Sequence, residues 1–428
     1  MEIFILVLSF VLLLAIGVPV GWSIGLSSLL TMLVSIPSIA AMTTVAQRMA
    51  TGLDSFALLA IPFFVLAGQI MNRGGIAQRL VNFARTLVGA LPGGLAHVNI
   101  IAAMLFGAIA GSAAAAASAI GSFMTKAMDD EGYSKEFAAA VNITASTTGL
   151  IIPPSNVLIV YSLASGGVSI AALFLAGYVP GILTGLALMT AAAIWAKRKG
   201  MPTGARSPLR KVARTFLSAL PGLLLLIVVI GGIVAGIFTA TEASAVAVLY
   251  CLILTFIYKE ISWKELPDIF LQSVATTAIV MLLIGASMSM SWIMAYENIP
   301  QAITDLLLSV SDSKIVVLLL INLILLGVGI FMDMTPAVLI FTPIFLPVVT
   351  ELGMSPIHFG IMMVLNLCIG LCTPPVGSIL FVGVSVAGTT IQKVIRPLLL
   401  LFVAMLISLL LVTYLPGLSL WLPALFGF

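Results

Sequence analysis

One carboxylate lies deep inside an apolar stretch of this chain. Asp333 occurs in the run Phe-Met-Asp-Met-Thr-Pro at residues 331–336, next to the hydroxyl of Thr335. An ionisable side chain is costly within a membrane, so one that is retained there is a functional candidate by default. A carboxylate, a hydroxyl and the carbonyls of an interrupted helix are oxygen ligands, which hard cations such as sodium prefer. The residues at this break therefore predict a cation site.

The first half of the chain has Ser112 where the second half has Asp333. Oxygen ligands there would come from backbone carbonyls and from the side chains of Ser112, Asn142, Ser146, Thr147, Thr148, Ser155 and Asn156. Serine and threonine in helices also bond back to a carbonyl one turn earlier. We favour this structural role for any single hydroxyl, and ion contact for Asp333.

Two double prolines interrupt the apolar stretches that carry these residues. The first follows Gly-Leu-Ile-Ile at 149–152, and the second follows Gly-Leu-Cys-Thr at 370–373. Proline lacks an N–H and disfavours helical geometry in the preceding residue, so each pair unwinds a helix and frees backbone groups. In lipid such groups are tolerated only where protein or a polar cavity covers them. Paired interruptions in two halves indicate a transporter binding site at the membrane midplane.

The interruptions belong to an internal repeat. A constant shift of 221 residues places Gly132 on Gly353, Gly149 on Gly370, Pro153 on Pro374 and Gly167 on Gly388. We predict three spans, a re-entrant helical hairpin, a discontinuous helix and a final span in each half. This odd number of crossings gives the halves opposite orientations, so the repeats are predicted to have inverted topology.

The predicted domains follow from this repeat. The first repeat covers 1–196. It has spans at 3–20 and 22–47, an amphipathic interfacial helix at 76–90, a hairpin at 92–128 with its tip near Gly111 and Ser112, and a broken helix at 136–164. The second repeat covers 215–428, with a hairpin at 315–350 and a broken helix at 356–387. One continuous span with a small-residue packing face is the alternative at 92–128, and an ordinary juxtamembrane helix fits 76–90 equally well.

Composition predicts an all-α polytopic membrane protein. Hydrophobic residues make up 61% of the chain, charged residues 8%, and the mean hydropathy is +1.27, which excludes a soluble protein. At about 20 residues per crossing, roughly ten to thirteen membrane segments fit, the first being a retained N-terminal span. The three cysteines occur in apolar runs, which predicts reduced packing residues and no transition-metal site. No nucleotide-binding or hydrolase motif occurs in a credible context, so we predict neither an enzyme nor a nucleic-acid partner.

The basic residues predict the orientation. The linker at 197–214 carries seven basic residues and no acidic one, and Lys and Arg accumulate in cytoplasmic loops. With this linker in the cytoplasm, every basic residue except Arg48 and Lys314 is predicted inside, and both termini are predicted to be periplasmic. Glu242 follows Thr239 by three residues, a spacing that favours a helix-capping role over ligand contact.

Several of these motifs resemble one family. The run Asn-Ile-Thr-Ala-Ser-Thr-Thr-Gly at 142–149, the turn at 239–243, the break at 333–336 and the element Thr-Pro-Pro-Val-Gly at 373–377 resemble the large membrane subunit of tripartite ATP-independent periplasmic (TRAP) transporters. The resemblance covers essentially the whole chain. The alanine run at 113–117 follows Gly-Ser where many dicarboxylate-type members carry an Asp, which favours the sialic-acid branch.

The resemblance implies sodium-driven import of an organic acid across a bacterial inner membrane. It implies two protein partners, a small four-helix membrane subunit and a periplasmic substrate-binding protein. It also implies an elevator-type architecture of the ion-transporter superfamily, in which hairpins and broken helices move against a scaffold. The alternatives are a self-sufficient sodium-coupled carboxylate carrier and, less favoured, a passive channel or membrane scaffold.

The predicted site residues fall into two sets. The sodium set is Ser112, Asn142, Ser146, Thr147, Gly149, Asp333, Thr335, Gly370 and Thr373. The substrate set is Thr148, Pro154, Ser155, Asn156, Asn366, Pro375 and Gly377. None of these residues is basic, so we expect a substrate carboxylate to be held by backbone amides at half-helix N-termini together with bound sodium.

Overall fold

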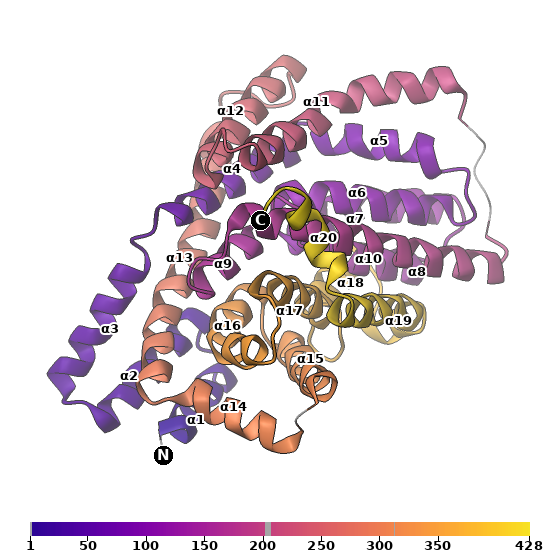
Figure 1. Cartoon of the computed structure of the whole chain (residues 1–428). Coiled ribbons are helices and arrows are strands. Elements are labelled where there is room, and N and C mark those ends of the chain that lie inside the picture. Colours follow the sequence, from indigo (N-terminus) through magenta and orange to yellow (C-terminus); the bar gives the residue numbers. More distant parts are fainter. Residues whose placement is uncertain (1, 202–206, 312) are drawn as a thin grey trace.

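Long apolar runs punctuated by proline and glycine become helices in the structure, a computed structural model that describes residues 2–201, 207–311 and 313–428. Within these residues the only other regular element is a short 3-10 turn, η1 (Phe56–Leu59), and there is no strand. The predicted basic linker at 197–214 falls partly on 202–206, outside the described residues. Figure 1 shows how the helices are arranged.

The helices of the first half come before the linker and those of the second half after it. The first set is α1 (Glu2–Ala15), α2 (Val20–Ser35), α3 (Ser38–Gly52), α4 (Ala60–Arg73), α5 (Ile76–Val88), α6 (Gly94–Ala110), α7 (Ala113–Asp130), α8 (Lys135–Thr148), α9 (Asn156–Ala164) and α10 (Ile170–Arg198). The second set is α11 (Leu209–Val234), α12 (Ala240–Tyr258), α13 (Leu266–Tyr296), α14 (Ile299–Val310), α15 (Lys314–Phe331), α16 (Met334–Glu351), α17 (Pro356–Gly370), α18 (Ser378–Ala387), α19 (Ile391–Tyr414) and α20 (Gly417–Leu425).

Eight of the described helical segments are long and apolar enough to cross a membrane, which identifies a polytopic membrane protein. They are η1 with α4, α10, α11, α12, α13, α15, α16 and α19. Eight is fewer than the ten to thirteen segments that the sequence predicts. The difference arises because several apolar stretches are divided into shorter helices, among them α1, α2, α17 and α18.

The prediction of one span at 22–47 is wrong. Helix α2 ends at Ser35, Ile36 is extended, and Pro37 stands at the N-cap of α3. Proline disfavours helical geometry in the residue before it and cannot donate to the preceding turn, so it divides the stretch into two helices. Figure 1 shows α3 projecting from the rest of the molecule.

Two pairs of helices turn sharply at residues that favour a helix end. Gly111 has a positive φ of 60° after α6, and Ser112 caps α7 by accepting a hydrogen bond from the amide of Ala115 at 3.3 Å. In the second half, Met332 and Asp333 are extended between α15 and α16. Helices α6 and α7 pack extensively against each other, whereas α15 and α16 make only limited contact.

The double prolines lie in the breaks between α8 and α9 and between α17 and α18. Both Pro-Pro bonds are cis. Each broken helix approaches the first arm of its neighbouring helix pair at paired glycines. A methyl group on Gly149 would lie 2.5 Å from Cα of Gly107, and one on Gly370 would lie 2.5 Å from Cα of Gly329. Only residues without a side chain allow backbones to come this close.

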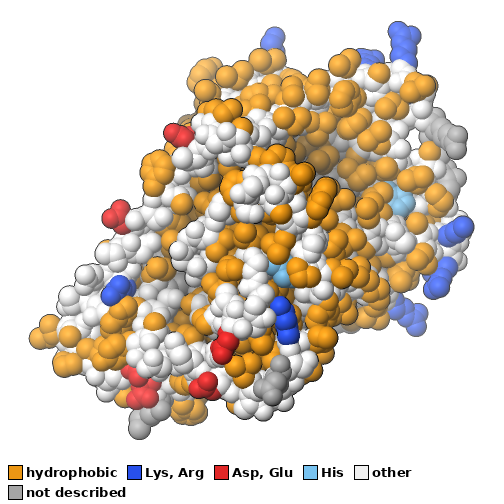
Figure 2. Space-filling view, in the orientation of Figure 1, with side chains coloured by type: hydrophobic (Ala, Val, Ile, Leu, Met, Phe, Trp, Pro, Cys, Tyr) orange, Lys and Arg blue, Asp and Glu red, His pale blue; other side chains and the backbone are white. Residues whose placement is uncertain are grey.

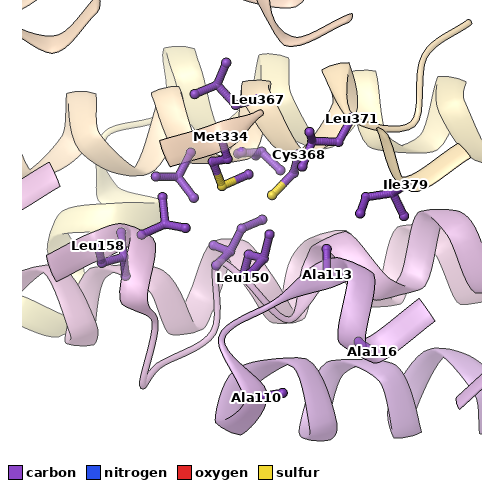
Figure 3. Packing of buried hydrophobic residues seen from close by; sticks show 14 of the residues in the cluster. Ala110, Ala113, Ala116, Leu150, Leu158, Met334, Leu367, Cys368, Leu371 and Ile379 are labelled. Carbon is purple, nitrogen blue, oxygen red and sulfur yellow. The ribbon is translucent and has the colours of Figure 1, made fainter. Parts of the chain in front are cut away.

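The two halves interlock. Helix α7 packs against α18 of the second half, and α16 packs against α9 of the first. Between them α8 contacts α17, where the thiol of Cys368 lies 3.2 Å from the carbonyl oxygen of Thr147. Figure 3 shows Leu150 of the first break facing Met334 and Cys368. The cysteines are buried and unpaired, as packing residues would be.

The capping role of Glu242 is confirmed. Its carboxylate accepts a hydrogen bond from the backbone N–H of Thr239 at 2.8 Å, and the Thr239 hydroxyl accepts from the Glu242 amide at 3.2 Å. This reciprocal pair satisfies two donors at the start of α12.

The charged side chains visible on one face of the molecule (Figure 2) are unevenly distributed, although some acidic residues, such as Glu131 and Asp129, pair with basic ones at the basic end. In Figure 2 most Lys and Arg side chains lie along the right-hand and upper edges, and the Asp and Glu side chains lie toward the left and lower left. At the right-hand edge α5 and α10 end and α8 begins in Figure 1. The faces between the two ends are largely apolar, as lipid contact requires.

Candidate transport site

A cavity of about 330 Å³ lies where the turns of the two helix pairs meet. Residues 111–115, at the turn between α6 and α7, form one wall, and Asp333, Met334 and Thr335 form another. Asn156 and Ser378 line it from the two breaks. The cavity therefore joins elements that are more than 200 residues apart in the sequence.

Four helices begin at the wall of this cavity. Ala113, Asn156, Met334 and Ser378 all line it, and they are the first residues of α7, α9, α16 and α18. Helix N-termini carry unpaired N–H groups and a partial positive charge, which together favour an anion. No described residue lining the cavity is Lys or Arg. The backbone is thus the positive group that the described walls offer to an anionic ligand.

Asp333 is the one charged side chain among the described residues that line the cavity. It occupies the N-cap position of α16, yet its carboxylate makes no capping hydrogen bond, and the side chain is exposed toward the cavity. A carboxylate repels an anion bound in the same cavity, so a site for both groups needs a cation between them. Asp333 and Thr335 supply oxygen ligands for such a cation, so the residues that line the cavity fit a hard cation.

Asn156 carries a polar atom without a protein partner. Its Oδ1 is buried and accepts no hydrogen bond from the described residues. Its amide nitrogen lies against Gly111, where a methyl group would meet Nδ2 at 2.5 Å. The free oxygen therefore belongs to a side chain that lies against the turn between α6 and α7 of the same half and lines the cavity.

The hydroxyls of α8 donate to carbonyls of the preceding turn, which is the structural role that we favour for them from the sequence. Ser146 donates to the carbonyl of Asn142 at 2.6 Å, Thr147 to that of Thr144 at 3.0 Å, and Thr148 to that of Ala145 at 2.6 Å. Donation leaves the lone pairs of each hydroxyl oxygen available to a cation. Asn142 is fully buried, donates to the Ala117 carbonyl at 2.8 Å, and has an Oδ1 without a partner among the described residues.

The predicted residues at and beside the second break do not line the transport cavity. The hydroxyl of Thr373 donates to the carbonyl of Ile369 at 2.7 Å, and the amide of Gly377 donates to the carbonyl of Ile330 at 3.0 Å. Pro375 is exposed. Asn366 is buried against Asn322, to whose Oδ1 it donates at 2.7 Å.

The structure brings part of the predicted set together. Four predicted residues line the cavity, namely Ser112, Asn156, Asp333 and Thr335. The others do not line it: Asn142, Ser146, Thr147, Thr148, Gly149, Pro154, Ser155, Asn366, Gly370, Thr373, Pro375 and Gly377. Gly149 and Gly370 are the close-approach positions described above, and Ser155 is buried with its hydroxyl directed to the carbonyl of Leu150.

Sequence reasoning missed the polar residues on the remaining wall. Gln69 and Asn72 of α4 and Thr276 of α13 line the cavity opposite the turns. Gln69 and Asn72 are three residues apart and therefore share a face of an otherwise apolar helix, which is the signal that could have found them. Gly68 precedes them, and a methyl group there would lie 2.8 Å from Cα of Ala110. Helix α4 thus meets the end of α6 beside the cavity.

Comparison with known proteins identifies the family. Residues 7–418 match the family model described as tripartite ATP-independent periplasmic transporter, DctM component. The chain belongs to this family. It is 58% identical to the uncharacterized protein YgiK of Salmonella typhimurium over 98% of this chain and 96% of that one.

Relatives of this TRAP large permease are named for different substrates. The chain is 40% identical to the sialic acid TRAP transporter large permease SiaM of Vibrio cholerae and 39% identical to the C4-dicarboxylate TRAP transporter large permease DctM of Rhodobacter capsulatus. Both matches cover 96% of each chain. The YdaH transporter of Alcanivorax borkumensis has a similar fold, with a TM-score of 0.67 over 90% of each chain at 13% identity. The family consists of transporter permeases, so the chain is a membrane transport protein.

Proposed function

We propose that this TRAP large permease carries an organic acid across the bacterial inner membrane together with sodium ions. The observation that supports this most directly is the cavity where four helix N-termini surround a single carboxylate, without a lining Lys or Arg. The N-termini suit an anionic substrate, and Asp333 suits a cation. One cavity then holds both the substrate anion and the cation, and the positive charge of the cation reduces the repulsion between the anion and Asp333.

Sodium is the cation that we propose. The available ligands at the cavity are a carboxylate, hydroxyls, backbone carbonyls and the free Oδ1 of Asn156, all of which are oxygens. In the described residues no group of three His, Cys, Asp or Glu side chains could hold a transition metal. Because sodium would offset the charge of Asp333, sodium and substrate should each strengthen the binding of the other by the same factor.

We further propose two inverted repeats that move as an elevator. Thr147 and Cys368 differ by the repeat shift of 221 residues and are in contact. Equivalent residues of two repeats meet only near the axis that relates them, so this contact suits a pseudo-twofold arrangement. The reciprocal packing of α7 on α18 and of α16 on α9 suits it as well. The helix pairs and broken helices would carry the cavity, while α4 and α13 would remain in the scaffold.

The proposed partners are a small four-helix membrane subunit and a periplasmic substrate-binding protein, as the tripartite family name suggests. Sialic acid remains the predicted substrate on the basis of the alanine run at 113–117. Overall identity does not favour it, since the relatives named for sialic acid and for C4-dicarboxylates are almost equally similar. A carrier that needs no binding protein is the alternative function.

Reconstitution tests the proposed function. We expect proteoliposomes that contain this chain and its small subunit to accumulate sialic acid only with an inward sodium gradient and a loaded binding protein. Replacing sodium by potassium in the same vesicles is the control for ion identity. Uptake without the binding protein would establish the alternative carrier. Uptake that is equally fast without a sodium gradient would reject sodium coupling, and a different transported acid would correct the substrate.

Cysteine labelling tests the orientation. Lys199 and Ser313 are both exposed, and they lie on the predicted cytoplasmic and periplasmic sides. The native cysteines are buried, so they should give little background. We expect Lys199→Cys to react with an impermeant reagent only after the membrane is opened, and Ser313→Cys to react in intact spheroplasts. Reaction of both variants in intact spheroplasts would contradict the inverted repeat.

A further inference from the structure

A second cavity, which shares no lining residue with the transport cavity, lies where α8, α10 and α19 meet at one end of the molecule. Its volume is about 590 Å³. The start of α8, the end of α10 and the start of α19 form its walls. Figure 2 shows basic side chains along the right-hand edge, where α8 begins and α10 ends in Figure 1. The proposed transport mechanism makes no use of this cavity.

The charge of this cavity is mainly positive. Lys199, Lys393 and Arg396 line it, and Glu136 is the one acidic side chain among its described lining residues. None of the three basic side chains forms an ion pair with another described residue. Three basic side chains around one hollow, with a single carboxylate among the described lining residues, make its local potential positive. The cavity therefore fits an anionic group such as a phosphate.

The cavity lies at the level of a membrane surface. Both α10 and α19 have membrane-spanning length and composition, and both have an end here. Trp195 lines the cavity and stacks on Phe137, with ring centroids 5.7 Å apart. Tryptophan is enriched where lipid headgroups meet water. An anion in this cavity would thus be at the depth of a lipid headgroup.

An apolar stripe runs away from the cavity along one face of α19. It starts below Arg396 and consists of Leu399, Val403, Ile407 and Leu410, whose exposed fractions are 57%, 49%, 52% and 42%. The spacing of three or four residues places these side chains on the same face as Arg396. A basic group with an exposed apolar stripe directly below it matches a ligand with a charged head and a hydrocarbon tail.

We propose that this cavity binds an anionic phospholipid, with the headgroup phosphate at Lys199, Lys393 and Arg396 and an acyl chain along the stripe of α19. Basic pockets between membrane helices on the cytoplasmic side are suited to such headgroups. Free phosphate shares the headgroup chemistry but would gain nothing from the apolar stripe. The stripe is the reason that we assign a lipid and not a soluble anion.

Ligand binding to the purified full-length chain in neutral detergent distinguishes a phospholipid from free phosphate. We expect dioleoyl-phosphatidylglycerol to bind at least tenfold more tightly than dioleoyl-phosphatidylcholine, as measured by native mass spectrometry. Glycerol phosphate and inorganic phosphate should compete only weakly, because each buried CH₂ of an acyl chain adds to the affinity. Competition by inorganic phosphate as strong as that by the lipid would assign a soluble anion instead. Equal binding of both lipids would reject a site for anionic lipid.

Paired variants locate the site. We expect Lys393→Ala/Arg396→Ala to weaken phosphatidylglycerol binding about thirtyfold, from the usual contribution of a basic side chain near an anionic lipid surface. The matched control is Arg210→Ala/Arg214→Ala on α11, which removes the same charge from exposed positions that do not line this cavity. It should change binding less than threefold, and Arg396→Lys should retain it within about threefold. Equal losses in both double variants would show general charge attraction and overturn the proposal.

Discussion

We expect Asp333→Asn to remove most sodium-dependent uptake while the protein still folds and enters the membrane. The substitution keeps the size of the side chain but removes the only charge among the described residues that line the transport cavity. Removing one partner of a close charge pair costs about 2 kcal/mol or more, which corresponds to a loss of about 30-fold in sodium affinity. The measurements are sodium titration of the purified protein and of uptake by proteoliposomes.

Asp305→Asn is the control for this experiment. Asp305 is exposed on α14 and does not line the cavity, so the change removes one negative charge without altering the site. It should leave the sodium titration unchanged. If Asp333→Asn kept normal sodium dependence, Asp333 would have a structural role at the N-terminus of α16, and the proposed cation site would have to lie elsewhere.

The helix breaks could be predicted because they rest on local backbone chemistry. Proline ends helices wherever it occurs in pairs, and the breaks at Pro153 and Pro374 follow from that rule. The turn at Gly111 is local in the same way, since it needs a positive φ. The division at Pro37 does not follow from this rule, because Pro37 is a single proline and other single prolines, such as Pro180, lie inside helices of the same structure.

The site could be predicted only in part because a cavity depends on which helices meet. Asp333 stood out by its charge, and Ser112 and Asn156 by their places beside breaks. Nothing local to Gln69 or Thr276 shows that α4 and α13 face the helix turns. Likewise, the sequence does not reveal which hydroxyls of α8 are directed to carbonyls of the preceding turn, since that depends on side-chain rotamers.

Gly149 and Gly370 illustrate the same limit. They were predicted as sodium ligands through their carbonyls, and that role stays a prediction. Their lack of a side chain has a separate reason that only the packing shows. In each half, a broken helix crosses the first arm of a helix pair backbone to backbone, at Gly107 with Gly149 and at Gly329 with Gly370. The glycines thus set the distance between the elements that shape the cavity.

Substitution at Gly329 should therefore destabilise the protein strongly, because a methyl group there would lie 2.9 Å from Cα of Gly370. Neither backbone can move away without shifting its helix, so we expect Gly329→Val to lower stability by about 3 kcal/mol or more. Thermal unfolding in detergent measures this, with the yield of monodisperse protein as a second readout. Gly107→Val should behave alike, since its methyl group would lie 2.9 Å from Cα of Gly149.

Gly327→Val separates packing from helix propensity. Gly327 lies on the same helix two residues earlier, and no atom lies within 4 Å of the position that its methyl group would occupy. Both variants replace glycine by valine inside α15, so intrinsic helix propensity changes equally in the two. Only Gly329→Val should therefore lower the unfolding midpoint. Equal unfolding midpoints for the two variants would mean that the backbones of α15 and α17 are not in close contact, and the glycine pairs would then not set the width of the cavity.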